Sequence, residues 1–187
     1  HLNHLSTGFV DELKFLNIPI VFTLHDFWLM CPRGQFLTRS IGEENNFQLC
    51  SGQENRKCAA NCYRVYFSGI DEQEQNDINR WSEWIDARMQ ETKSIINKVD
   101  LFIAPSRYLR NRFINDFGIP ESKIVYLDYG FPLEYLTPSE TATVSRIFTF
   151  GYIGTHIPAK GVNQLIEAFA QIEAPAKLKI FGRENGQ

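Results

Sequence analysis

The chain lacks any excess of positive charge: 19 Lys and Arg stand against 22 Asp and Glu, which gives a formal net charge of −3. Because nucleic-acid-binding domains usually have a high pI and a clustered basic patch, this balance argues against DNA or RNA as a partner. The sequence also lacks an apolar run near the ~20 residues that a membrane-spanning helix needs, and it has no leader with a charged and then an apolar region. We therefore expect a soluble, cytoplasmic protein.

Material for a packed core is present, because 43% of the 187 residues are hydrophobic and 13% are aromatic. Such a composition argues against disorder. The chain opens on His1 without an initiator Met, and it ends on Arg-Glu-Asn-Gly-Gln directly after an apolar run. We expect both ends to be cuts through a longer protein.

Helices and strands alternate along the predicted pattern. Apolar residues at three- and four-residue steps predict helices over residues 5–16, 77–99, 106–117 and 160–172. Short apolar runs predict strands over residues 20–24, 101–104, 123–127, 146–153 and 178–181. This alternation is typical of an α/β fold with mostly parallel sheets, in which ligands bind at the carboxyl ends of the strands.

Two segments lack sustained periodicity. The lack of periodicity over residues 27–74 predicts an irregular stretch. Its length suggests that it is a functional loop or that a local cross-link holds it in shape. Residues 128–144 hold Gly130, Pro132 and Pro138, which is typical of a linker. We expect this linker to divide the strands between two separate sheets.

Several short motifs occur in an order that is familiar as a set. Together they resemble the retaining glycosyltransferases of the GT-B fold, the "group 1" enzymes of glycosyltransferase family 4. The motifs that carry the resemblance are Thr-Leu-His-Asp-Phe-Trp at 23–28, Ala-Pro-Ser at 104–106, Gly-Ile-Pro at 118–120, Tyr-Gly-Phe at 129–131, Gly-Tyr-Ile-Gly at 151–154 and Lys-Gly-Val at 160–162.

The resemblance implies parts of two Rossmann-like domains. Residues 1–130 would form the later part of the N-terminal, acceptor-side domain, with the irregular segment 27–74 as an insertion. Residues 131–145 would be the interdomain linker, and residues 146–187 the start of the C-terminal, donor-binding domain. The family's glycine-rich loop and paired glutamates would lie outside this chain, so we expect the isolated fragment to be inactive.

The resemblance also implies an activity. Such an enzyme moves a sugar from a nucleoside-diphosphate sugar to a hydroxyl acceptor with retention, in polysaccharide or glycolipid synthesis, and needs no cofactor for the chemistry. A glycan or lipid-linked acceptor implies peripheral association with the inner membrane face. Two alternatives remain open: a GT-B-like protein that binds or isomerises a nucleotide sugar without transfer, and a non-enzymatic, metal-clamped interaction module.

His25 and Asp26 end the first predicted strand, and the resemblance implies that they are the catalytic pair of this fragment. An imidazole there would contact the donor sugar or its leaving phosphate, as a hydrogen-bond donor or a cation. The alternative is a histidine that only caps the strand. Asp26 would orient the imidazole or accept backbone N–H groups. His4 corresponds to an acceptor-side histidine of the family.

The donor diphosphate site is expected between the fourth strand and the helix after it. Gly151 and Gly154 would let the backbone approach the phosphates, and Lys160 would add positive charge at a helix start that favours anions. Many family members carry an arginine directly after the second of these glycines, where this chain has Thr155 and His156. We expect His156 or a residue elsewhere to supply that charge. The alternative for Lys160 is an exposed lysine without a ligand.

Ser106 predicts an N-cap rather than a nucleophile, because no Gly-x-Ser-x-Gly sequence surrounds it. Arg107, Arg110 and Arg112 follow it. We interpret them as a solvated helix face, although an anionic acceptor or lipid headgroup is an alternative.

The cysteines lie together in the irregular segment, at positions Cys31, Cys50, Cys58 and Cys62. Four thiolates suit a tetrahedral structural metal, most simply zinc. Free thiols, disulfides and an iron–sulfur cluster are the alternatives, and the expected cytoplasmic location disfavours disulfides.

Overall fold

The structure is a computed structural model, and it describes residues 6–39, 47–64, 74–135, 147–157 and 160–183. Its chain divides into two units, residues 1–130 and residues 131–187, which are treated one at a time below. Both units are built from parallel strands and helices, so the predicted α/β fold class is confirmed.

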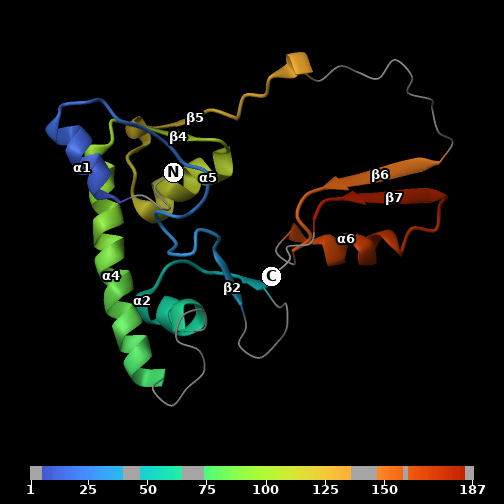
Figure 1. The fold of residues 1–187 in the computed structure, drawn as a ribbon, viewed down its shortest axis with the longest axis horizontal. Helices are drawn as coiled ribbons and strands as arrows, with labels where there is room; N and C mark the ends of the chain where they lie inside the picture. The colour runs from blue at the N-terminus through green and yellow to red at the C-terminus, as the bar shows by residue number, and fades with distance from the viewer. Residues whose placement is uncertain (1–5, 40–46, 65–73, 136–146, 158–159, 184–187) are drawn as a thin grey trace. The chain divides into compact units, whose positions relative to one another are not determined.

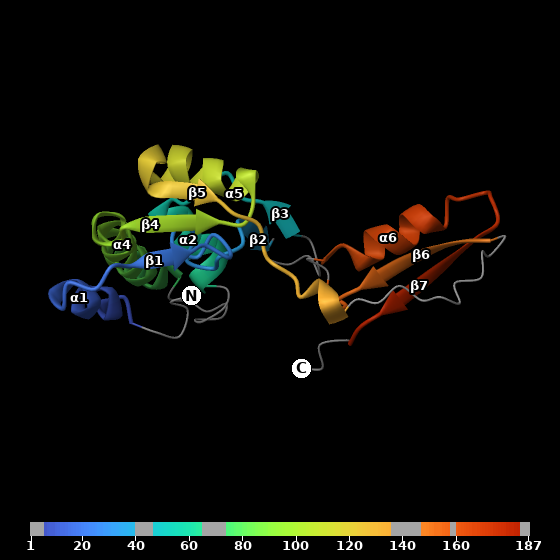
Figure 2. The same ribbon diagram turned by 90° about the horizontal axis from the view of Figure 1, so that it is seen from above.

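The first unit contains a sheet of three parallel strands in the order β1-β4-β5 (Figure 2). The register places Phe22 opposite Phe102, and Phe102 opposite Ile124. All four residues of β4 are apolar, as expected for a strand that has neighbours on both edges and helices around the sheet. The strands are β1 (Val21–Thr23), β4 (Leu101–Ala104) and β5 (Ile124–Tyr126), as the three apolar runs predict.

The helix after β4 begins and ends as predicted. The Oγ of Ser106 accepts a hydrogen bond from the backbone N–H of Leu109 at 3.1 Å, which confirms the N-cap. The helix consists of α5 (Arg107–Arg112), followed by a π-helical turn, η2 (Phe113–Phe117). Gly118 ends it with a φ of 88°, a left-handed conformation that favours glycine. The buried Phe113 and Phe117 of this turn belong to the same core as Phe102.

The longest helix is α4 (Glu74–Lys98), and α1 (Gly8–Phe15) and α2 (Asn55–Cys58) pack against it at different heights (Figure 1). A buried stripe on α4 explains the packing, because its members recur at three- and four-residue steps. The stripe consists of Ile85, Met89, Thr92 and Ile95. None of the helices in the described part of the chain is long and apolar enough to cross a membrane.

The prediction of an irregular stretch over residues 27–74 is wrong in part. Two strands of three residues each pair antiparallel, with Thr38 opposite Gln48, and a short helical segment follows them. Elements this short do not complete the repeats by which periodicity is recognised. They are β2 (Leu37–Arg39), β3 (Phe47–Leu49), α2 and the π-helical turn η1 (Ala59–Tyr63). Residues 40–46 and 65–73 lie outside the described parts.

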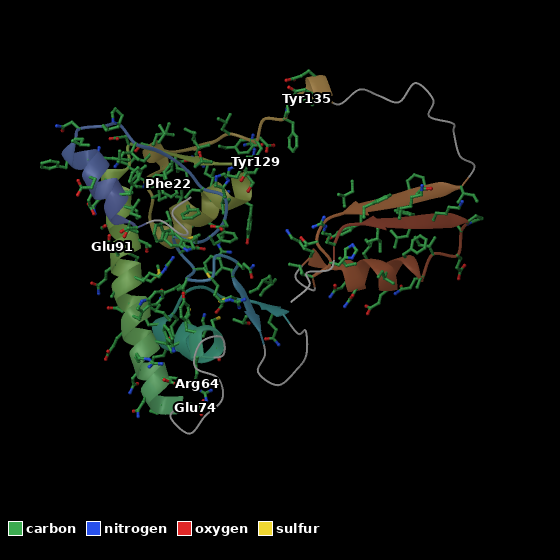
Figure 3. All side chains as sticks on the ribbon, in the orientation of Figure 1. Phe22, Arg64, Glu74, Glu91, Tyr129 and Tyr135 are labelled. Carbon is green, nitrogen blue, oxygen red and sulfur yellow. The ribbon has the colours of Figure 1, made fainter. Side chains whose placement is uncertain are left out.

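An ion pair joins the end of η1 to the start of α4. Arg64 is buried, and its Nη1 lies 3.2 Å from Oε1 of Glu74 (Figure 3). A buried guanidinium needs such a partner because an unpaired charge away from water is costly. The pair therefore connects the start of the long helix to the short helical segment.

The second unit contains two parallel strands with a helix between them in sequence. Phe150 on the first strand lies with its ring centroid 6.0 Å from that of Phe169 on the helix. The helix begins later than predicted, because Gly161 before it has a φ of 71°, which no helical residue adopts. The elements are η4 (Leu133–Tyr135), β6 (Phe148–Ile153), α6 (Val162–Phe169) and β7 (Ala176–Phe181).

Asp100, the residue before β4, connects three elements of the first unit. Its Oδ2 accepts a hydrogen bond from the backbone N–H of Ile20 at 2.8 Å, and its Oδ1 lies 2.8 Å from Nζ of Lys14 on α1. The hydrogen bond from Lys14, followed by that from Ile20, lowers the pKa of this carboxyl below its ordinary value. The carboxylate therefore stabilises the fold in its ionised form.

We predict that Asp100→Asn lowers the thermal midpoint at pH 7, and that the difference from wild type becomes smaller as the pH falls below the ordinary pKa of an aspartate, 3.8. A carboxyl with a lowered folded-state pKa contributes stability above its unfolded pKa and loses it as the pH falls through the folded value. Thermal melts between pH 3 and 7 measure this. Glu83→Gln, which changes an exposed carboxylate of α4, serves as the control. A deficit that is equally large at pH 3 would contradict the ionic role.

Candidate functional site

The carboxyl edge of the first sheet brings His25 and Tyr129 together across the end of β4. His25 follows β1 and Tyr129 follows β5, the two strands that flank β4. Nδ1 of His25 lies 2.8 Å from the hydroxyl of Tyr129, and the two rings stack with centroids 5.7 Å apart and planes inclined by 6°. Both side chains are exposed, and Figure 3 shows Tyr129 beyond the end of β5. The imidazole is thus held in one orientation at the edge where α/β folds bind ligands.

Asp26 organises the turn that follows His25. Its Oδ1 accepts a hydrogen bond from the backbone N–H of Trp28 at 2.8 Å. Gly34, with a φ of 76°, lies against the same carboxylate, and a Cβ at that position would be 3.4 Å from Oδ2. The predicted role as an acceptor for backbone N–H groups is therefore present. A role in orienting His25 stays a prediction.

The long helix α4 fixes the same turn from the other side. Nη2 of Arg88 donates to the carbonyl oxygen of Trp28 at 2.5 Å, and its guanidinium lies 4.4 Å from the centroid of the indole ring. Trp28 is thus held by a hydrogen bond and a cation–π contact together. Beside this turn is a hollow lined by Phe22, Thr23, Leu24, His25, Asp26, Trp28 and Leu29.

The prediction that the arginines of α5 form a solvated face is wrong for two of them. Arg110 is half-buried, and its Nη2 lies 2.7 Å from Oε1 of Glu121. Arg112 is also half-buried, is paired with Asp116, and lies 4.9 Å from the ring of Phe36. Both therefore hold the fold together. Arg107 is exposed and lies over the ring of Tyr126.

The four cysteines lie around one pocket, and all four are free thiols, so no disulfide joins them. Burial is the main cause that raises the pKa of the Cys58 thiol, to about 11, and burial likewise raises the pKa of Cys62. These two thiols are protonated near neutral pH and are not activated nucleophiles. The acceptor-side candidate His4 lies outside the described residues.

In the second unit, the predicted donor residues follow β6. Gly154 donates its N–H to the carbonyl of Phe181 at 2.9 Å, and His156 donates its N–H to the carbonyl of Arg183 at 3.0 Å. The chain after β6 is therefore tied to the end of β7. Nε2 of His156 is buried and has no hydrogen-bond partner among the residues that the structure describes. The carbonyl oxygen of Thr155 accepts from the hydroxyl of Tyr152 at 3.1 Å.

Lys160 and Gly151 lie differently from the predicted arrangement. Lys160 is exposed and precedes α6 by two residues, with its backbone N–H bonded to the carbonyl of Ile157 at 2.9 Å. It therefore lies in the turn ahead of the helix rather than in its first turn. Gly151 lies within β6 opposite Lys179, two residues before the last residue of the strand.

Gly182 is a residue that the sequence did not single out. It ends β7 with a φ of 154°, and a Cβ at its position would lie only 1.8 Å from the carbonyl oxygen of Gly154. The two strand ends can approach so closely only because this residue has no side chain. The signal in the sequence is a glycine directly after the strand predicted over residues 178–181.

Parallel strands joined by helices, with polar residues after the carboxyl ends of those strands, define a Rossmann-like α/β protein. A family model for Glycosyltransferase Family 4 matches residues 1–135, which is most of the chain. The chain therefore belongs to glycosyltransferase family 4, and the resemblance predicted from its motifs is confirmed. No curated protein matches it significantly.

We predict that Gly182→Ala destabilises the second unit by about 1–3 kcal/mol, the usual cost of forcing extra atoms into a packed site. The added Cβ would have to displace the carbonyl of Gly154. Gly151→Ala is the matched control, because a Cβ there meets nothing within 4 Å. Urea unfolding measures the change in stability, and hydrogen exchange of the backbone amides of β6 and β7 shows whether it lies in the second unit. Equal stability of the two variants would contradict the close approach.

Proposed function

We propose that this protein transfers a sugar from a nucleoside-diphosphate sugar to a hydroxyl acceptor, with retention at the anomeric carbon. The observation that carries the proposal is the imidazole of His25, held by Tyr129 at the carboxyl edge of the sheet, within the stretch that the family model matches. That membership makes the chain a glycosyltransferase domain. The donor, the retention and the acceptor are what the proposal adds.

In the proposed mechanism, His25 contacts the donor sugar or its leaving phosphate. A neutral imidazole can donate one hydrogen bond, and a protonated one adds a positive charge beside a phosphate. The stacked ring of Tyr129 limits rotation of the imidazole, so little entropy is lost when the donor binds. Asp26 and Arg88 act through the backbone of the turn after His25, and they are positioning residues.

The second unit would bind the diphosphate in the turn between β6 and α6. The first N–H groups of a helix have no partner within the helix, and the helix dipole favours an anion there. Lys160 adds an exposed ammonium group two residues before α6. Nε2 of His156, which is buried and has no hydrogen-bond partner among the described residues, would offer a further hydrogen bond if the turn opens, and this supports its proposed role in place of the arginine of other family members.

Catalysis would depend on positioning and on the stabilisation of charge. The leaving nucleoside diphosphate gains negative charge as the glycosidic bond of the donor breaks, and preorganised positive groups lower that barrier. The acceptor hydroxyl would attack from the face that the diphosphate leaves, which retains the anomeric configuration. This mechanism requires neither a protein nucleophile nor a bound metal.

The resemblance also supports an acceptor that is a growing glycan or a lipid-linked sugar, in polysaccharide or glycolipid synthesis. The protein would then act in the cytoplasm, in peripheral contact with the inner membrane face. A hydroxyl acceptor on a lipid would keep the reaction close to that surface.

We predict that His25→Ala lowers kcat for sugar transfer by about 100-fold, the scale of losing one hydrogen-bond donor from a preorganised site. Release of nucleotide is measured for the whole product of the gene, with UDP- and GDP-sugars and a lipid extract. Tyr129→Phe removes the hydroxyl that holds the imidazole and should lower kcat less. Tyr135→Phe, which changes another exposed tyrosine, is the control.

Full transfer by the His25→Ala variant would refute its role. Release of nucleotide that does not increase when acceptor is added would instead favour a protein that binds or hydrolyses the donor without transfer. Comparing the anomeric configuration of the product with that of the donor tests retention.

We predict that Lys160→Ala weakens binding of the nucleoside diphosphate by about 1.5–3 kcal/mol, the range of a hydrogen bond to a charged group. This corresponds to a Kd about 10- to 150-fold higher. Calorimetric titration with UDP and GDP measures it. Lys177→Ala removes an exposed lysine of β7 and should leave the Kd unchanged. Equal effects of both variants would show only a loss of general positive charge.

A further inference from the structure

All four cysteines of the chain line one pocket in the first unit, although 18, 7 and 3 residues separate them in sequence. They come from three parts of the fold. Cys31 lies in the turn after β1, Cys50 directly follows β3, Cys58 ends α2 and Cys62 lies in η1. Sugar transfer as proposed above uses none of them.

Backbone hydrogen bonds order the loop of Cys31 and join Cys50 to that loop. The N–H of Cys31 donates to the carbonyl of Phe27 at 2.7 Å, and its own carbonyl accepts from Gly34 at 2.7 Å. The N–H of Cys50 donates to the carbonyl of Phe36 at 2.8 Å. The loop that carries Cys31 is thus bonded directly to the residue that carries the second thiol.

The other two cysteines lie one helical turn apart, on the same side of a continuous helical segment. Glu54 caps that segment, with its carboxylate accepting the N–H groups of Arg56 and Lys57 at 3.1 and 3.0 Å. Its carbonyl accepts the N–H of Cys58 at 2.8 Å. Cys58 and Cys62 are therefore presented together by a capped element rather than by a loose loop.

The surroundings suit a thiolate-bound cation. The walls of the pocket include Pro32, Phe36, Leu37 and Tyr63, and the side chains of Cys58 and Cys62 are buried. Four thiolates around one divalent ion carry a net charge of −2, which needs positive groups nearby.

Two cations stand beside the pocket. Arg33 lines it and hydrogen-bonds Cys62. Nζ of Lys57 bonds the carbonyl of Gly52 at 2.5 Å and Oγ of Ser51 at 3.1 Å, in the loop after Cys50.

We propose that Cys31, Cys50, Cys58 and Cys62 bind one Zn²⁺ as a tetrahedral tetrathiolate that fastens β3, α2 and η1 to the turn after β1. Zinc fits because thiolates are soft ligands and four of them complete a closed structural site. Each thiol loses its proton as its S–Zn bond forms, so the four protons pass to solvent and no electron is transferred. Within the described residues, no three ligand side chains are already at metal-binding spacing, so the proposal requires the four thiols around the pocket to move closer together when the metal binds.

The proposed zinc site would stabilise the structure around His25 and would not take part in the chemistry of the sugar. Cys31 belongs to the same turn as Trp28, and this turn follows the imidazole directly. A metal that anchors Cys31 to three cysteines of other elements would therefore hold that turn in place. The proposal concerns metal binding alone and does not depend on sugar transfer.

The test is a titration of the reduced, metal-free protein with Co²⁺ and then Zn²⁺ under anaerobic conditions. We expect one Co²⁺ per chain, with visible bands of tetrahedral cobalt and a thiolate-to-cobalt charge-transfer band, and displacement by one Zn²⁺. Cys50→Ser should weaken Co²⁺ binding at least about tenfold, since even loss of a residue behind the ligands costs that much. Ser122→Ala, which changes an exposed serine that does not line the pocket, should bind as wild type.

The metal titration of the wild-type protein tests the zinc proposal even if a cysteine variant fails to fold. No charge-transfer band, or a Zn²⁺ stoichiometry well below one per chain, would overturn the proposal. So would iron with inorganic sulfide in the anaerobically purified protein, because it would make the site an iron–sulfur cluster. A thermal midpoint that falls when a chelator removes Zn²⁺, and recovers when Zn²⁺ is restored, would support the structural role.

Discussion

The first unit depends on β4, because in the described sheet this strand alone is hydrogen-bonded along both edges. Parallel strands cannot be joined by tight turns, so β1 and β5 reach β4 from distant parts of the chain. The fully buried Phe102 lies on β4 between Phe22 and Ile124, and the core is continuous around it. Everything at the carboxyl edge, His25 and Tyr129 included, takes its position from these two pairings.

Much of this fold could be predicted from the sequence, and the reason is length. The helix α4 is 25 residues long with a stripe at helical spacing, and β4 is an unbroken apolar run, so both can be recognised from the local sequence. The segment after β1 could not be predicted in the same way. β2 and β3 have three residues each and exist because they pair with each other, while the π-helical turns depend on hydrogen bonds that leave no periodic mark.

In the candidate site, too, residues marked by the local sequence could be predicted, whereas contacts between distant residues could not. His25 was predictable because it directly follows a strand, and strand ends are where ligands bind in such folds. Its partner Tyr129 is 104 residues away, and nothing near His25 in sequence points to it. Gly182 was missed for a related reason: its need to be glycine comes from the carbonyl of Gly154 on another strand. Local patterns indicate which residues are candidates, whereas partnerships between strands require the assembled sheet.

The stacked rings of His25 and Tyr129 have a consequence for how this chain can vary in length. Each ring lies two or three residues after an outer strand, and the side chains along such a strand alternate between the two faces of the sheet. Removing or adding a single residue in β1 or β5 would turn the ring to the opposite face and separate the pair, even if the hydrogen bonds to β4 were all restored. Insertions and deletions near this edge are therefore tolerable only beyond the two rings, where the chain has left the sheet.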